Sequence, residues 1–78
     1  MVNMTKQKFV VLIEKDEDGI YIGTVPELKG CYSYGDTLDD LMENIREAIL
    51  AHLELLKSRN EPLPPIKFQG IQEIEIEA

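Results

Sequence analysis

The sequence predicts an α+β fold with the element order β-β-β-α-β, in which one helix covers one face of a four-stranded sheet. Three observations predict it. The first half of the chain contains short runs of β-branched and aromatic residues separated by turns with glycine. A long segment with apolar residues at helical spacing follows. After a proline-rich linker, the last eight residues alternate between isoleucine and glutamate.

The first three strands are predicted over residues 8–15, 20–25 and 30–35. The first contains five consecutive large apolar residues, and a polar turn that ends at Gly19 joins it to the second, which is typical of a β-hairpin. Pro26 ends the second strand because it has no N–H for a sheet hydrogen bond. The third is aromatic and bracketed by glycines. Together they form an antiparallel meander.

A helix is predicted from about Leu38 to Ser58, with Asp36 or Thr37 as its N-cap. Acidic residues gather at its start, and Lys57 and Arg59 lie near its end, as the helix dipole favours. One side of this helix is an apolar stripe. The stripe consists of Leu38, Leu41, Met42, Ile45, Ala48, Ile49, His52, Leu53 and Leu56.

The chain after the helix predicts a linker and one more strand. Residues 60–65 contain three prolines and cannot continue a helix. Ile71–Ala78 alternates Ile74 and Ile76 with Glu73, Glu75 and Glu77, which indicates a half-buried strand. Because strand–helix–strand crossovers are right-handed, we expect this last strand to lie beside the first and parallel to it.

Size and charge exclude several classes of protein. The 78 residues allow one small domain, over residues 1–78, and not a two-domain enzyme. Eight basic and 15 acidic residues give a net charge of −7, which argues against direct binding to nucleic acid and suits a basic protein partner. The single cysteine permits no internal disulfide, and no apolar run approaches the ~20 residues of a membrane span. We expect a cytoplasmic protein.

The predicted sheet is apolar on both faces, but the chain offers one helix to cover it. Each large aliphatic side chain left in water forgoes ~1.5–3 kcal/mol of burial. We therefore expect self-association as a dimer or larger homo-oligomer, or another protein partner. The alternative is that the N-terminal or proline-rich segment folds back over the second face. The candidate contact residues are Val10, Leu12, Tyr21, Tyr32, Tyr34, Leu50 and Leu55.

No catalytic, metal or cofactor site is predicted, and we expect no enzymatic activity. His52 lies within the apolar stripe without a recognisable nucleophile, and Cys31 is expected to be a small buried side chain. Carboxylates at Glu14, Glu43 and Glu73 or Glu75 are the only arrangement suggesting Mg²⁺ and phosphodiester cleavage, but Glu43 points away from the stripe. No phosphate-binding glycine loop and no zinc spacing occur.

The central segment resembles the signature of the HicB-like antitoxin family. The matching residues are an aromatic-rich strand at Tyr21–Val25, Pro26-Glu27-Leu28-Lys29-Gly30-Cys31, an aromatic residue, and Gly35-Asp36-Thr37-Leu38 at the start of the helix. The helix segments 43–49 and 51–54 and the exit at 61–64 also match. The resemblance covers residues 8–65. Lys29 stands where the family often has proline, and Leu41-Met42 replace a usual Glu-Ala.

The resemblance implies a partial RNase H-like fold of the same β-β-β-α-β order. It also implies that the protein neutralises a HicA-type toxin, a small basic RNA-cleaving protein, by binding it. Many family members carry a C-terminal DNA-binding domain, which we do not expect here because the sequence ends at Ala78. Three functions remain open: this antitoxin-like binding module, an oligomeric domain without a toxin partner, and a residual metal-dependent nuclease.

Overall fold

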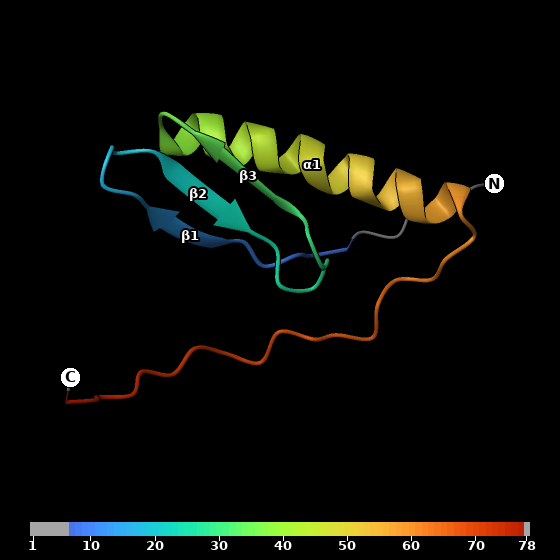
Figure 1. Ribbon diagram of the computed structural model, residues 1–78. Coiled ribbons are helices and arrows are strands. Elements are labelled where there is room, and N and C mark those ends of the chain that lie inside the picture. The colour runs from blue at the N-terminus through green and yellow to red at the C-terminus, as the bar shows by residue number, and fades with distance from the viewer. Residues whose placement is uncertain (1–6, 78) are drawn as a thin grey trace.

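The structure is a computed structural model that describes residues 7–77, and it contains a three-stranded antiparallel sheet with one helix packed on it (Figure 1). The strands are β1 (Leu12–Lys15), β2 (Tyr21–Thr24) and β3 (Tyr32–Gly35), in the spatial order β1-β2-β3. The helix α1 spans Leu38–Ser58. The predicted meander and its covering helix are confirmed, and the helix bounds agree with the prediction.

All three strands are shorter than predicted, and β1 begins late because its ladder with β2 ends at Pro26. Leu12 pairs with Thr24, and the next hydrogen-bonding position of β2 would be Pro26, which has no N–H. The N–H of Val10 instead donates to the side chain Oε1 of Glu27 at 2.9 Å. This bond keeps the chain before β1 alongside the sheet after the regular ladder has ended.

Local interactions fix both ends of α1. Thr37 is the N-cap, and its hydroxyl accepts a hydrogen bond of 3.0 Å from the N–H of Asp40. At the other end, the N–H of Arg59 donates to the carbonyl of Leu55, and Asn60 adopts a left-handed φ of 57°. A left-handed residue after the last turn is a common helix terminator.

The core lies between α1 and the side of the sheet formed by β2 and β3. Two glycines permit a close approach: a Cβ on Gly23 would meet the Leu41 side chain at 3.0 Å, and one on Gly35 would meet the Leu41 backbone at 2.5 Å. The loop after β2 adds further buried residues, held by a hydrogen bond from the Val25 N–H to the Cys31 carbonyl. The buried side chains are Val25, Leu28, Cys31, Leu41 and Ile45.

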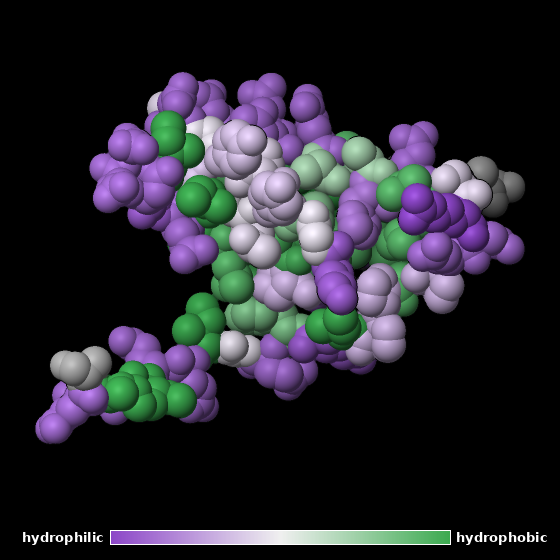
Figure 2. All heavy atoms as spheres, in the orientation of Figure 1, coloured by the Kyte–Doolittle hydropathy of each residue, from purple (hydrophilic) through white to green (hydrophobic). Residues whose placement is uncertain are grey.

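The predicted fourth strand is not formed. Residues 61–77 contain no helix or strand, and the chain from 71 to 77 runs apart from the body of the molecule (Figures 1 and 2). Ala78, the last residue of the predicted strand, lies outside the described residues. The sequence predicted that this strand would lie parallel to β1, and this prediction is wrong for residues 71–77. Alternation favours an extended backbone, but a strand also needs an edge within reach of its hydrogen-bonding groups.

Candidate partner-binding surface

The face of the sheet turned away from α1 carries a group of apolar and aromatic side chains, of which Tyr32 and Tyr34 are exposed and Val10, Leu12 and Ile22 are half-buried. Gly23 and Gly35 face Leu41, so residues of the opposite parity on β2 and β3 point to the other side. The register places Leu12, Thr24 and Tyr32 in one row, and Glu14, Ile22 and Tyr34 in the next. Tyr32 and Tyr34 are 61% and 60% exposed. We call these six residues, together with Val10, the open face.

The candidate contact residues divide into three groups. Val10, Leu12, Tyr32 and Tyr34 belong to the open face by strand alternation. Tyr21 lies two residues from Gly23 on β2 and therefore points to the side of α1. There the Lys15 ammonium stands 5.0 Å from its ring centroid. Leu50 and Leu55 are both exposed on the helix. The structure thus brings four of the seven predicted residues onto one surface.

Two acidic residues border the open face where β1 turns into β2. A hollow of about 440 Å³ there is lined by Ile20, Ile22 and Tyr34, with Asp16 and Asp36 at its edge. The carboxylate of Asp16 accepts from the N–H groups of Asp18 and Ile20, each at 2.9 Å, which fixes its position in the turn. Sequence reasoning did not select Ile22 or the two aspartates. The alternation of residues 20–25 was the signal that could have added Ile22.

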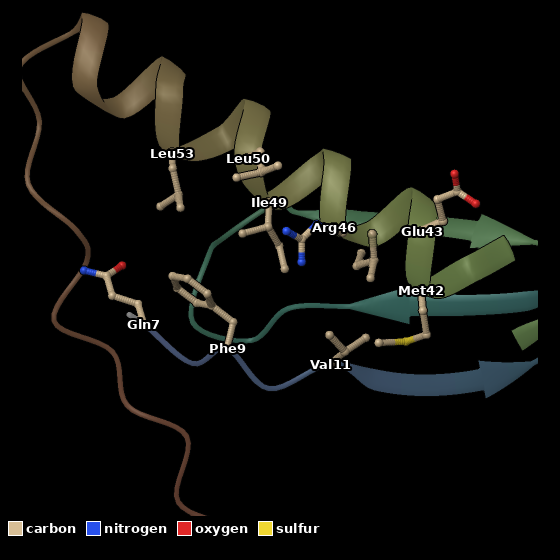
Figure 3. A pocket seen from close by; sticks show the side chains of 10 residues that line it. Gln7, Phe9, Val11, Met42, Glu43, Arg46, Ile49, Leu50 and Leu53 are labelled. Atoms are coloured by element: carbon tan, nitrogen blue, oxygen red, sulfur yellow. The ribbon is translucent and has the colours of Figure 1, made fainter. Parts of the chain in front are cut away.

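A second apolar hollow, of about 730 Å³, lies between α1 and the chain that leads into β1. Figure 3 shows Phe9 and Val11 on the sheet side of this hollow, with the side chains of α1 reaching toward them from above. We call it the β1 groove. Leu50 was predicted as a contact residue and lines it, whereas the other apolar lining residues of the helix had been assigned to its apolar stripe. From the helix they include Met42, Ile45, Ile49, Leu50 and Leu53.

The lone cysteine and histidine do not form a reactive pair. Cys31 is buried, and this burial raises the pKa of its thiol, which keeps the thiol protonated and unreactive at neutral pH. His52 is half-buried on the helix, and no hydrogen bond of its side chain is found within residues 7–77. Cys31 therefore serves as a core side chain.

The carboxylates that were weighed as a possible Mg²⁺ site do not come together in the described part of the chain. No group of three or more metal-ligating side chains occurs among residues 7–77. Glu14 lies on β1, Glu43 is exposed on α1, and Glu73 and Glu75 stand on the detached C-terminal segment. Across the same residues, no helix is long and apolar enough to cross a membrane.

These features define a small α+β domain with one covered and one uncovered sheet face. The chain belongs to the family described as HicB_like antitoxin of bacterial toxin-antitoxin system, whose model matches residues 9–76. Family membership supports an antitoxin-like role and, by the same reasoning, a non-catalytic one.

Relatives cover nearly the whole chain. A UPF0150 protein of Synechocystis sp. is 53% identical over 73 residues, which are 94% of this chain and 100% of that protein. A UPF0150 protein of Archaeoglobus fulgidus is 44% identical over 88% of this chain and 94% of its own. Among solved structures, the N-terminal domain of Burkholderia pseudomallei antitoxin HicB superposes with a TM-score of 0.64 at 36% identity, over 82% of this chain and 72% of that one.

Proposed function

We propose that this protein is an antitoxin that neutralises a small, basic, RNA-cleaving toxin of the HicA type by direct binding through the open face. The observation that carries the proposal is an uncovered apolar sheet face, bordered by carboxylates, on a chain with a net charge of −7. The family to which the chain belongs supports the antitoxin role.

The open face has the composition of a protein-binding surface. Tyr32 and Tyr34 are rigid aromatic side chains that stand side by side on β3, and tyrosine is enriched among residues that dominate binding energy. Ile22, in the row of Tyr34, supplies an aliphatic neighbour. A partner that covers this face removes apolar surface from water, which is the main driving force of protein association.

The charge of the chain selects the kind of partner. Asp16 and Asp36 border the open face, and Glu14 lies on it. A protein that binds RNA presents lysine and arginine to phosphates, and such a surface is attracted to this face. The attraction accelerates association, and occupation of the basic surface excludes RNA from it. Neutralisation then needs binding alone and no catalytic group from this chain.

The test is co-expression with any small basic protein that the neighbouring reading frame encodes. We expect the two proteins to co-purify, and we expect RNA cleavage by the basic protein to stop when this chain is present in equal amount. The double variant Tyr32→Ala/Tyr34→Ala is expected to weaken binding by roughly a hundredfold or more, because each aromatic anchor contributes about 1–2 kcal/mol or more. The control Leu55→Ala removes an exposed apolar side chain from the helix, away from the open face, and is expected to leave binding unchanged.

Charge is tested by a matched pair of variants. Glu14→Gln lies on the open face and Glu47→Gln on the exposed side of α1, so both lose one negative charge. We expect Glu14→Gln to slow association and to reduce its salt dependence more than Glu47→Gln does. The proposal is rejected if the neighbouring frame encodes no small basic protein and none co-purifies, or if such a protein does not bind. It is also rejected if the tyrosine double variant binds as tightly as the native chain while remaining folded by circular dichroism.

A further inference from the structure

Strand β1 pairs with β2 on one side and has a free edge on the other. The N–H of Asp16 donates to the carbonyl of Ile20, so the backbone groups of Leu12 and Glu14 also point toward β2. By alternation, the N–H and C=O groups of Val11 and Ile13 point outward from the sheet. Within residues 7–77, no hydrogen bond reaches these outward groups.

The opposite edge of the sheet differs. There the outward carbonyl of Tyr34 accepts a hydrogen bond of 2.9 Å from the side-chain amide of Asn44 on α1. The helix thus contributes to closing the β3 edge, and the β1 edge is the one open to another strand. Exposed edges of this kind are templates for pairing with a further strand.

The β1 groove provides the side-chain half of the same site. The helix packs on β3 and β2 but not on β1, so Met42, Ile49 and Leu53 extend over the space beside β1 (Figure 3). Phe9 and Val11 form its other wall. A strand added to β1 at the usual spacing of about 4.8 Å enters this space and places alternate side chains under the helix.

The C-terminal segment 71–77 has the pattern such a strand requires. Ile74 and Ile76 fall on one face, and Glu73, Glu75 and Glu77 on the other. Within the described chain no other segment covers these isoleucines: Ile71, Ile74 and Ile76 are 74%, 82% and 73% exposed. Exposed apolar residues grouped in this way mark sites of interaction with another protein.

The path of the linker directs the segment to another molecule. Leu63, Pro64 and Pro65 share a small hollow with Phe9 and Leu28, so the linker already passes the beginning of β1. Beyond it the chain continues outward, and segment 71–77 stands apart from the rest of the molecule (Figures 1 and 2). Pro64 and Pro65 keep this part of the linker extended.

We propose that segment 71–77 of one copy adds as a fourth strand to the β1 edge of a second copy, with Ile74 and Ile76 in the β1 groove, and that the exchange is reciprocal. Two equivalent exchanges form a closed two-fold dimer. The β1 edge of each copy is then paired, and the glutamates of each segment 71–77 remain in water. The open face is not used, so this dimer is compatible with the proposed partner binding and is tested separately from it.

The first test is the molecular mass of the native chain by sedimentation equilibrium at micromolar concentration. We expect twice the 8.9 kDa of the monomer. Truncation after Gly70 and the double variant Ile74→Thr/Ile76→Thr are both expected to give monomers. The dissociation constant should rise roughly a thousandfold in the double variant, because each dimer carries four of these substitutions and each removes part of an isoleucine burial.

The matched control is Glu73→Thr/Glu75→Thr, which introduces the same residue on the opposite face of the same segment. It is expected to remain a dimer. Circular dichroism of each variant verifies that the helix and sheet persist, so loss of the dimer is not confused with unfolding. A monomeric native chain, or a dimer that survives truncation after Gly70, overturns the proposal.

A second measurement decides which molecule supplies the strand. A dimer formed from one ¹³C-labelled and one unlabelled copy is examined by isotope-filtered NMR. Contacts between the Ile76 methyl groups of one copy and the Val11 methyl groups of the other establish the exchange. Contacts within a single copy alone mean that the segment returns to its own β1, which also overturns the proposal. The neighbouring basic protein is absent throughout.

Discussion

Gly35→Ala is expected to be among the most damaging single-methyl additions to this protein. The structure allows no room for a Cβ at this position: it would stand 2.5 Å from the Leu41 backbone nitrogen and 2.9 Å from the Asp40 carbonyl carbon. Both neighbours belong to the first turns of α1 and cannot rotate away. The helix must therefore shift away from β3, and the buried side chains of Leu41 and Ile45 shift with it.

The magnitude follows from two opposing effects. Overpacking that displaces backbone costs about 3 kcal/mol, at the upper end of measured small-to-large substitutions. Replacing a strand glycine by alanine returns about 0.5–1 kcal/mol of conformational entropy. The free energy of unfolding should thus fall by about 2 kcal/mol, a large fraction of the stability of a domain this small.

Gly23→Ala is the control because it adds the same methyl group to the neighbouring strand on the same face. Its Cβ would meet the side-chain ends of Leu41 at 3.0 Å and Val11 at 3.1 Å, which can adjust by rotation. We expect a change close to zero and at most about 1 kcal/mol. Urea unfolding followed by circular dichroism measures both. If Gly35→Ala is no less stable than Gly23→Ala, the argument from helix–sheet contact is refuted.

Three further predictions concern the helix cap, the core and the thiol. Thr37→Ala removes the hydroxyl that accepts from Asp40 and should cost about 1 kcal/mol in urea unfolding, whereas Thr37→Ser keeps the hydroxyl and should be nearly neutral. Leu28→Ala should cost about 3 kcal/mol in the same assay, because its side chain is 1% exposed and the cavity cannot fill; a loss below 1 kcal/mol contradicts this. Burial raises the pKa of Cys31, so the thiol ionises at lower pH in the unfolded state than in the folded one. Its contribution to the free energy of unfolding is therefore full below the ordinary thiol pKa of about 8.5 and falls as the pH rises above that value. Cys31→Ala should lack this alkaline loss.

Local signals were sufficient for the helix and the meander. Thr37 as N-cap, the apolar stripe and the residues after Ser58 act within one or two turns, so the bounds of α1 follow from sequence. The hairpin between β1 and β2 follows from the turn that ends at Gly19. The strand ends required knowledge of the register, because Pro26 limits β1 as well as β2 only when the two are paired.

The candidate surface was predictable in part. Alternation along β1 indicated Val10 and Leu12, but Tyr21 was assigned to it before the register was known. The β1 groove was not anticipated, because Ile49 and Leu53 belong to the same helical stripe as the buried Leu41. The apolar stripe of the helix does not predict which of its residues extend beyond the edge of the sheet.

The sequence by itself determined the helix, the three-stranded meander and which of their side chains share a face, because periodicity and capping act between residues close in the chain. It also determined the net charge of −7. Only the tertiary structure decided that α1 lies over β3 and β2 and leaves the β1 edge uncovered, and that segment 71–77 stands away from it. Those outcomes depend on contacts between residues far apart in sequence, such as Gly35 against Leu41 and the linker against Phe9, which no local pattern specifies.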